Sequence, residues 1–436
     1  MSDQKHWTKP LRAAGLLGAG KTGQAVLMLV ATALSARALG VEQFGTLVLI
    51  HGLIVAIAKT ARFQTWQALI HYGAKAHELG DMARLQRVIR FSALLDIFTA
   101  FIAFGVVWIA SGPAIDLFGL EPSLSDTTRI YGSVIVLMVL NGTPNGVLQL
   151  YDRFDRIAWQ SAAAGFIRFV GSLYLFVTGG GLLEFLVVWY SAEIFAALVL
   201  IVMGLRTLCE KGLMAGLFKS SPSLLKPEPG IWRYVCGTQI ASTLDLSGTH
   251  LPVLFVGGVL GPGAAGLYRI ANEFASVLLK PGAKLFGRAI YPDLARLSAQ
   301  NDALARRKMI VRTAVLIGGI ALLVFALFVV FGRQIIILSA GDEFVGAYAT
   351  MIWLCFAGVI STAGFALEPM LISAGRIRQT VIARAGATIV FIPALYVLLL
   401  QHGIVGAGIA ALIYTILTIF FMLIAGRYLL KGQVDD

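Results

Sequence analysis

Long apolar stretches, separated by short polar connections, follow one another along the whole chain. A membrane-crossing helix needs about 20 mostly apolar residues, and about twelve stretches reach that length. The alternation of apolar and polar residues that builds a β-barrel is absent from the sequence. The pattern predicts an all-α polytopic membrane protein with about 12 transmembrane helices. The expected spans are 13–36, 43–70, 88–110, 127–150, 157–178, 182–205, 231–259, 264–290, 309–331, 344–372, 379–400 and 403–427.

The second half of the chain repeats the first. Residues 39–45 and 260–266 both read L-G-x-x-x-x-G, about 221 positions apart, and each lies between two apolar stretches. The register holds downstream, because a basic cluster that ends at Arg90 corresponds to one that ends at Arg312. Two similar membrane lobes around a shared cavity are typical of transporters. The repeat therefore predicts two pseudo-symmetric six-helix bundles.

The longest hydrophilic stretch lies between the two repeats and contains Pro222, Pro227 and Pro229, as expected of a linker. No segment outside the membrane is large enough to fold alone. We therefore expect an N-terminal lobe over 1–208, a cytoplasmic linker loop over 209–230 and a C-terminal lobe over 231–436.

Composition supports a membrane protein. The chain is 58% hydrophobic and 13% charged, with a mean hydropathy of +0.82, whereas soluble domains carry about 25% charged residues. Lysine and arginine divide twenty-five to three between alternate sets of connections, and the richer set is expected in the cytoplasm. Both termini are thus expected in the cytoplasm, in a multi-pass membrane protein whose first apolar stretch is a retained helix.

The net charge of +12 follows from this bias and fits adhesion to anionic membrane lipids, so no nucleic-acid partner is expected. The cysteines Cys209, Cys236 and Cys355 have no ligand or redox spacing, and no metal site or cofactor is predicted. The outer connections are short, which disfavours an enzyme such as a glycan polymerase or ligase.

Ionisable side chains inside the spans are the candidate functional residues, because such residues are costly in a membrane and usually face a cavity or a partner. In the second span Lys59 and Arg62 share a helix face with His51 and Trp66. Lys21 in the first span and Asp245 in the seventh lie on polar stripes of their own. In the eighth span one face carries Arg269, Asn272, Glu273, Ser276 and Lys280.

Structural interpretations compete with a cavity role. Lys21, Lys59, Arg62 and Lys280 lie toward helix ends and could extend to the membrane surface. Arg269 and Glu273, four residues apart, could neutralise each other. Arg168 and Glu193 are expected to form a structural ion pair. Three further residues receive no role: Asp96, Glu368 and Arg384.

The segment Leu34–Gly45 (L-S-A-R-A-L-G-V-E-Q-F-G) resembles the first hairpin of the polysaccharide transporters, the O-antigen-type lipid-linked oligosaccharide flippases of the multidrug/oligosaccharidyl-lipid/polysaccharide exporter (MOP) superfamily. Residues 257–262 and 265–269 resemble the matching start of the second lobe. The resemblance implies a MATE-like fold with alternating access and a cationic central cavity lined largely by spans 1, 2, 7 and 8. It also places Arg269 where the family often has a cation.

The resemblance therefore implies a flippase of the bacterial inner (plasma) membrane, acting as a monomer. We expect it to move a polyprenyl-diphosphate-linked oligosaccharide from the inner to the outer leaflet for cell-surface polysaccharide assembly. The predicted cavity residues are Lys21, Lys59, Arg62, Arg269, Asn272 and Lys280, and the candidates for coupling to H+ or Na+ are Asp245 and Glu273. Expected partners are the lipid-linked oligosaccharide, membrane lipids and other polysaccharide-assembly proteins. The alternative is a multidrug or organic-cation antiporter of the same superfamily, which should present carboxylates to its cargo. Cations outnumber acids inside the spans and favour an anionic cargo.

Overall fold

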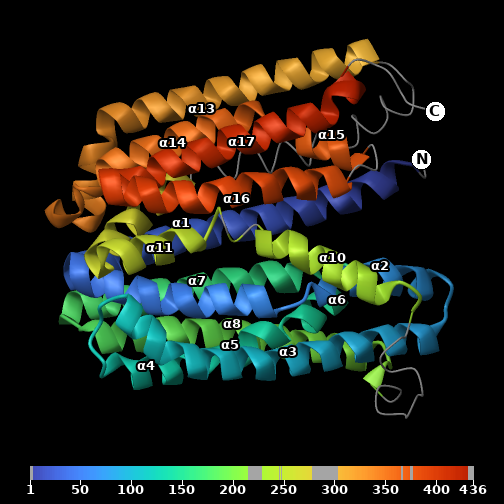
Figure 1. Ribbon diagram of the computed structural model, residues 1–436. Coiled ribbons are helices and arrows are strands. Elements are labelled where there is room, and N and C mark those ends of the chain that lie inside the picture. Colours follow the sequence, from blue (N-terminus) through green and yellow to red (C-terminus); the bar gives the residue numbers. More distant parts are fainter. Residues whose placement is uncertain are drawn as a thin grey trace. The chain divides into compact units, whose positions relative to one another are not determined.

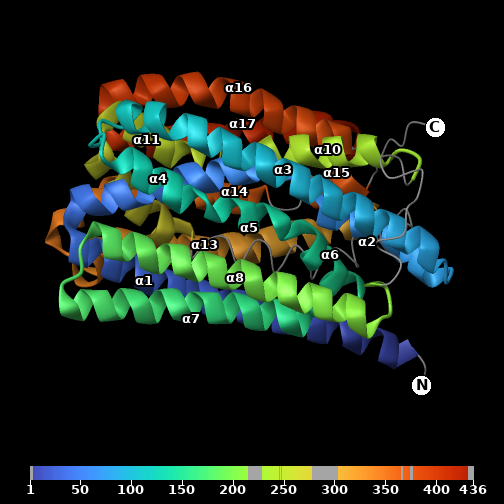
Figure 2. The same ribbon diagram turned by 90° about the horizontal axis from the view of Figure 1, so that it is seen from below.

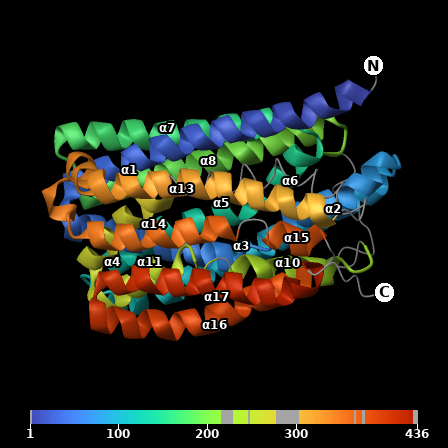
Figure 3. The same ribbon diagram turned by 90° about the horizontal axis from the view of Figure 1, so that it is seen from above.

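The structure, a computed structural model, describes residues 3–214, 228–244, 246, 248–276, 303–364, 367–373 and 377–430. Within these ranges the regular structure is helical, and no strand occurs. Long helices run side by side, as α7 with α8 and α16 with α17 (Figures 1, 2 and 3). The prediction of an all-α polytopic protein is confirmed.

The first six predicted spans correspond to α1 through α8. Spans 1 and 2 form one continuous run that turns at Gly40, and span 4 consists of three short helices in sequence. The bounds are α1 (Asp3–Ala61), α2 (Thr65–Glu78), α3 (Met82–Leu117), α4 (Leu124–Gly132), α5 (Val134–Leu140), α6 (Gly142–Leu150), α7 (Phe154–Thr178) and α8 (Leu182–Glu210).

The second half follows the same order in its described residues. The bounds are α10 (Ile231–Leu244), α11 (Leu251–Leu260), a helix over 262–276, α13 (Ala303–Ala340), a 3-10 turn (Asp342–Phe344), α14 (Ala347–Ala363), α15 (Leu367–Ser373), α16 (Ile377–His402) and α17 (Ile404–Leu430). Eight helical stretches in the described ranges are long and apolar enough to cross a membrane, and the first of them contains two predicted spans. Two shorter apolar helices, Leu251–Leu260 and Ala347–Thr362, lie in spans 7 and 10.

The chain divides into two compact units. Unit 1 comprises Met1–Ala38 and Ile50–Leu246, and unit 2 comprises Leu39–Leu49 and Ser247–Asp436. The first helix of the second repeat, α10, thus belongs to unit 1, whereas the turn between spans 1 and 2 belongs to unit 2.

Large apolar side chains on the outer faces of the helices are exposed. Phe101 and Ile109 of α3 are 70% and 76% exposed, and Leu338 of α13 is 80% exposed. Exposure of this extent in a soluble protein would mark an interaction surface. On helices of membrane-spanning length it marks the faces that contact lipid hydrocarbon.

The repeated L-G-x-x-x-x-G segment has a structural reason in both copies. Its first glycine turns the chain between two spans with a positive φ, +70° at Gly40 and +87° at Gly261, a conformation that favours glycine. Its last glycine allows close packing. A Cβ atom on Gly45 would lie 1.8 Å from the carbonyl oxygen of Pro262, and one on Gly266 would lie 2.8 Å from that of Val41.

This packing is reciprocal. Val41 and Pro262 hold the third position of the motif in their respective copies, so each copy presents its last glycine to the third residue of the other. Glu42 adds a polar contact, because its carboxylate accepts a hydrogen bond from the backbone N–H of Gly263 at 3.1 Å. The two copies therefore meet as equivalent surfaces within unit 2.

Candidate functional site

The second span is interrupted at residues 62–64. Helix α1 ends at Ala61, α2 begins at Thr65, and the residues between them are not helical. Interrupted membrane helices expose backbone groups and commonly mark the substrate site of a transporter. Two of the predicted residues lie here, Lys59 in the last turn of α1 and Arg62 in the interruption itself.

A buried carboxylate from α3 holds this interruption. Asp96 is 1% exposed, and one of its oxygens accepts a 2.7 Å hydrogen bond from the hydroxyl of Thr65 at the start of α2. The other oxygen accepts 2.7 Å bonds from the backbone N–H and the hydroxyl of Thr143, at the start of α6. A Cβ on Gly142 would lie 2.1 Å from the Thr65 hydroxyl oxygen, so the site requires glycine there. Asp96 therefore fixes the interruption in span 2 and the start of α6 together.

The side chain of Arg62 is partly buried and interacts electrostatically with Asp96. Its Nε atom is buried and has no hydrogen-bond partner among the described residues. A buried polar group without a partner is rare in a folded protein and calls for an explanation such as a ligand. Arg62 thus combines a positive charge, an unused donor and a location at a helix interruption.

Helix α10 forms further hydrogen bonds with residues at the interruption. The Gln239 side-chain amide donates to the backbone carbonyls of Thr60, at 2.7 Å, and Lys59, at 3.2 Å. These carbonyls lie in the last turn of α1, where helical partners are missing. Gln64 donates to the hydroxyl of Ser242 at 2.9 Å and accepts from the indole of Trp66 at 2.8 Å. Polar groups of α10 thus replace the hydrogen bonds that the interruption removes from span 2.

In unit 2 the predicted residues lie on the helix over 262–276. Arg269 forms an ion pair with Glu273. The two side chains thus neutralise each other, as their spacing of four residues allows. The two side chains are 21% and 19% exposed. The Nε atom of Arg269 is buried and, like that of Arg62, has no hydrogen-bond partner in the described ranges. Asn272, on the same helix, is partly exposed.

The remaining predicted residues lie outside what the structure describes. These are Asp245 and Lys280, which fall in undescribed segments, and Lys21, whose side chain is not described. That cations of both halves line one cavity, and that Asp245 or Glu273 couples to an ion, stay predictions.

Several polar residues of the spans serve helix packing instead. Ser35 of the first span is fully buried, and its hydroxyl lies 3.4 Å from that of Ser172 on α7. The His51 Nδ1 atom lies 2.7 Å from the hydroxyl of Tyr131, and its ring meets Trp189 edge to face with centroids 5.0 Å apart. Some polar residues of the spans thus pack between helices, whereas Arg62 lies at the interruption.

The guanidinium of Arg168, expected to pair with Glu193, lies 3.3 Å from the centre of the Trp189 ring. Glu193 lies within electrostatic range of it. Arg384 and Glu368, which received no role from the sequence, form an ion pair at 2.7 Å.

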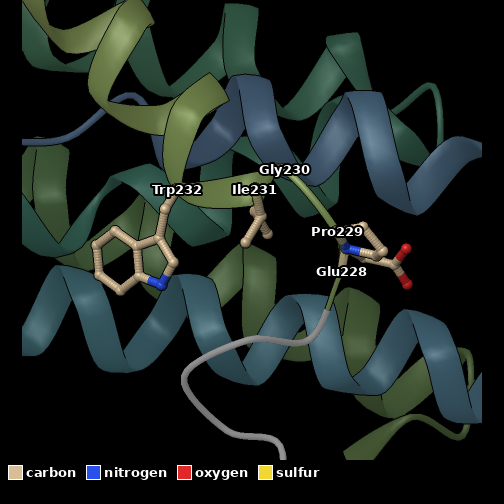
Figure 4. Close-up of a pocket in the computed structure, with 5 residues that line it drawn as sticks. All are labelled: Glu228, Pro229, Gly230, Ile231 and Trp232. Atoms are coloured by element: carbon tan, nitrogen blue, oxygen red, sulfur yellow. The ribbon is translucent and has the colours of Figure 1, made fainter.

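A cavity of about 340 Å³ lies where the chain enters α10, lined by Glu228, Pro229, Gly230, Ile231 and Trp232 (Figure 4). Glu228 accepts two hydrogen bonds of 2.5 Å from Arg84 at the start of α3, and Trp232 packs edge to face on Phe91. These contacts attach the entrance of α10 to unit 1.

The fold matches solved structures of membrane transporters. A MATE family multidrug resistance transporter of the MOP superfamily, in an inward-facing conformation, superposes with a TM-score of 0.77 over 93% of this chain and 94% of its own, at 14% identity. The lipid II flippase MurJ superposes with a TM-score of 0.71 over 94% and 87%, at 12% identity. The predicted MATE-like fold is confirmed.

Sequence comparison then identifies the family. Residues 34–349 match the family described as "Polysaccharide biosynthesis protein", and the chain belongs to it. It is also 30% identical to the inner membrane protein YghQ of Escherichia coli (strain K12), over 79% of this chain and 98% of that protein. Together with the apolar helices, these matches define an integral inner-membrane protein and confirm the resemblance seen in the sequence.

Proposed function

We propose that this protein is a flippase that moves a polyprenyl-diphosphate-linked oligosaccharide from the inner to the outer leaflet of the membrane. One observation carries the proposal: Arg62 lies in an interrupted membrane helix with a buried donor that no described residue uses. A guanidinium binds phosphate oxygens through charge and directed hydrogen bonds together. Membership of a polysaccharide biosynthesis family supports a glycan as the group attached to that phosphate.

In this mechanism Arg62 binds the diphosphate and lowers the barrier to carrying its charge through apolar surroundings. Lys59, one turn earlier, adds positive charge near the same interruption. Arg269 is the second proposed arginine contact, and Glu273 balances its charge when no cargo is bound. The remaining predicted cavity residues are Lys21, Asn272 and Lys280, and coupling to H+ or Na+ is proposed at Glu273 or Asp245.

The test is glycan export in a strain that lacks the gene. Without the protein, lipid-linked glycan should accumulate on the inner side of the membrane and surface glycan should fall. Arg62→Ala should fail to restore export, and Arg62→Lys should restore it in part, because it keeps the charge but loses the planar fork of donors. Arg333→Ala is the matched control, because Arg333 is exposed. Full export by Arg62→Ala, at wild-type amounts in the membrane, would refute the proposed phosphate contact.

A multidrug or organic-cation antiporter is the second candidate, because the fold also matches a MATE transporter. Drug resistance in a strain without its own efflux pumps separates the two candidates. The flippase proposal expects no gain of resistance from this protein, whereas an antiporter should raise the inhibitory concentration of cationic drugs.

A further inference from the structure

The carboxylate of Asp96 interacts with one residue through its charge and with two others through hydrogen bonds. It interacts electrostatically with Arg62, yet the three hydrogen bonds that it accepts from described residues, all 2.7 Å long, come from Thr65 and Thr143. A carboxylate near an arginine normally accepts directly from the guanidinium, which uses up the donors of the arginine. Here the two threonines donate to the carboxylate, and the Nε–H of Arg62 has no acceptor among the described residues.

We propose that Asp96 is a positioning residue that offsets the charge of Arg62 without accepting its Nε–H, so that this donor remains available for a phosphate oxygen. The proposal rests on the proposed function and deepens it, because it states what holds the phosphate-binding arginine ready. A cation in apolar surroundings is costly without a nearby negative charge. A freely rotating carboxylate would meet that need but would also compete with the cargo for the same donors. Fixing the carboxylate with two threonines keeps its negative charge near Arg62 and prevents it from competing with the cargo.

Variants of Asp96 and of Thr143 should change the affinity for diphosphate in opposite directions. Asp96→Asn keeps the size of the side chain and can still accept from Thr143, but it removes the negative charge that opposes an incoming phosphate. Diphosphate binding should become about tenfold tighter, because a neighbouring unit charge contributes that much or more at the effective dielectric of a protein. A residue that only stabilised the fold would instead weaken binding when changed.

Thr143→Val should act in the other direction. It removes one of the donors that hold the Asp96 oxygen and leaves the charge unchanged. The same oxygen keeps its bond from the backbone N–H of residue 143 but can now accept one more, which we expect Arg62 to donate. The cargo then loses that donor, and binding should weaken by about fivefold. Thr143→Ser is the matched control, because it keeps the hydroxyl and should bind as the wild type does.

The experiment measures binding of farnesyl diphosphate to the purified full-length protein in detergent by calorimetry, with farnesol as the uncharged control. Wild type should bind the diphosphate and not farnesol, and Arg62→Ala should lose most of that binding. In the Arg62→Ala background, Asp96→Asn should have little effect, because the diphosphate no longer binds beside Asp96.

The outcomes separate this inference from the proposed function. If Arg62→Ala binds as wild type does, or wild type shows no preference for the diphosphate, both are wrong. If Arg62→Ala weakens binding but Asp96→Asn leaves it unchanged or weaker, the role of Asp96 is wrong and the phosphate contact stands. If Asp96→Asn does not fold, the threonine pair decides: weaker binding by Thr143→Val than by Thr143→Ser supports the role, and equal binding overturns it.

Discussion

Two residues of the repeated motif have roles that follow from backbone geometry alone. The first glycine of each copy turns the chain, at Gly40 and Gly261. The last glycine permits close contact, at Gly45 and Gly266. The turning glycines face open space or a side chain. Gly45 and Gly266 face backbone carbonyls of the other copy, which cannot rotate away. The last glycine of the motif is therefore the less replaceable one.

Gly45→Ala should lower the free energy of unfolding by about 2 kcal/mol, because the added methyl group overlaps the carbonyl of Pro262 and the packed turn must shift. Gly105→Ala is the control. Gly105 lies within α3 with no atom near its Cβ position, so alanine should stabilise the helix by about 0.5–1 kcal/mol. Thermal unfolding of both variants in detergent checks the expectation, and equal melting temperatures would contradict it.

At the same scale, the residues missed by the sequence interpretation are informative. Asp96 was assigned no role, because a single aspartate near the end of an apolar span gives no periodic pattern. Its importance comes from Thr65 and Thr143, which are 31 and 47 residues away. Only the packing of three spans brings these residues together. One sequence signal was available, a glycine followed by threonine inside span 4 at Gly142-Thr143, but such pairs also occur in ordinary membrane helices.

At the scale of elements, the spans were predictable and their interruptions were not. Span length and order followed from apolar runs, which reflect the thickness of the membrane. The interruption at 62–64 reads Arg-Phe-Gln, with no glycine or proline to indicate where a helix stops. Gln239 donates to the backbone carbonyls that lose their helical partners there, and Asp96 binds the side chain of Thr65 just after the interruption. Tertiary contacts, rather than local preference, determine this boundary.

Gln239→Ala should therefore destabilise the contact between α10 and the end of α1. It leaves the carbonyls of Lys59 and Thr60 without their donor, a loss of about 1–2 kcal/mol. Gln239→Glu should cost more, because a carboxylate would face the same two carbonyl oxygens. The exposed Gln43 provides the control variant Gln43→Ala. The measurement is thermal unfolding in detergent, and a Gln239→Glu protein as stable as wild type would show that the amide does not bond to these carbonyls.

At the scale of the whole molecule, the fold matches solved structures of membrane transporters, and the chain belongs to a polysaccharide biosynthesis family. The repeat, the span number and the resemblance were sufficient to predict both. The identity of the cargo depends on a few charged side chains, of which Arg62 lies at a helix interruption and Arg269 is paired with Glu273. That these two arginines line one cavity stays a prediction.

The expected orientation has a direct test in the native cysteines. Cys209 is exposed near the end of α8, and Cys355 is 1% exposed. In the Cys236→Ser variant, a membrane-impermeant maleimide should label Cys209 in inside-out vesicles and not in intact cells, because the connection after α8 belongs to the basic set that is predicted to be cytoplasmic. Unfolding in detergent should add Cys355 as a second labelled site. Labelling of Cys209 from outside intact cells would reverse the predicted topology.

The reciprocal glycine contact also bears on how such a chain arose. Each copy of the motif supplies both the small residue and the carbonyl that receives it, as in the joint of a two-fold symmetric dimer. A half-length ancestor would thus have carried all that was needed to join with a second copy of itself. Fusion of two such genes would preserve the joint while freeing the halves to diverge elsewhere, which explains why the motif is still legible in both halves when most neighbouring positions differ.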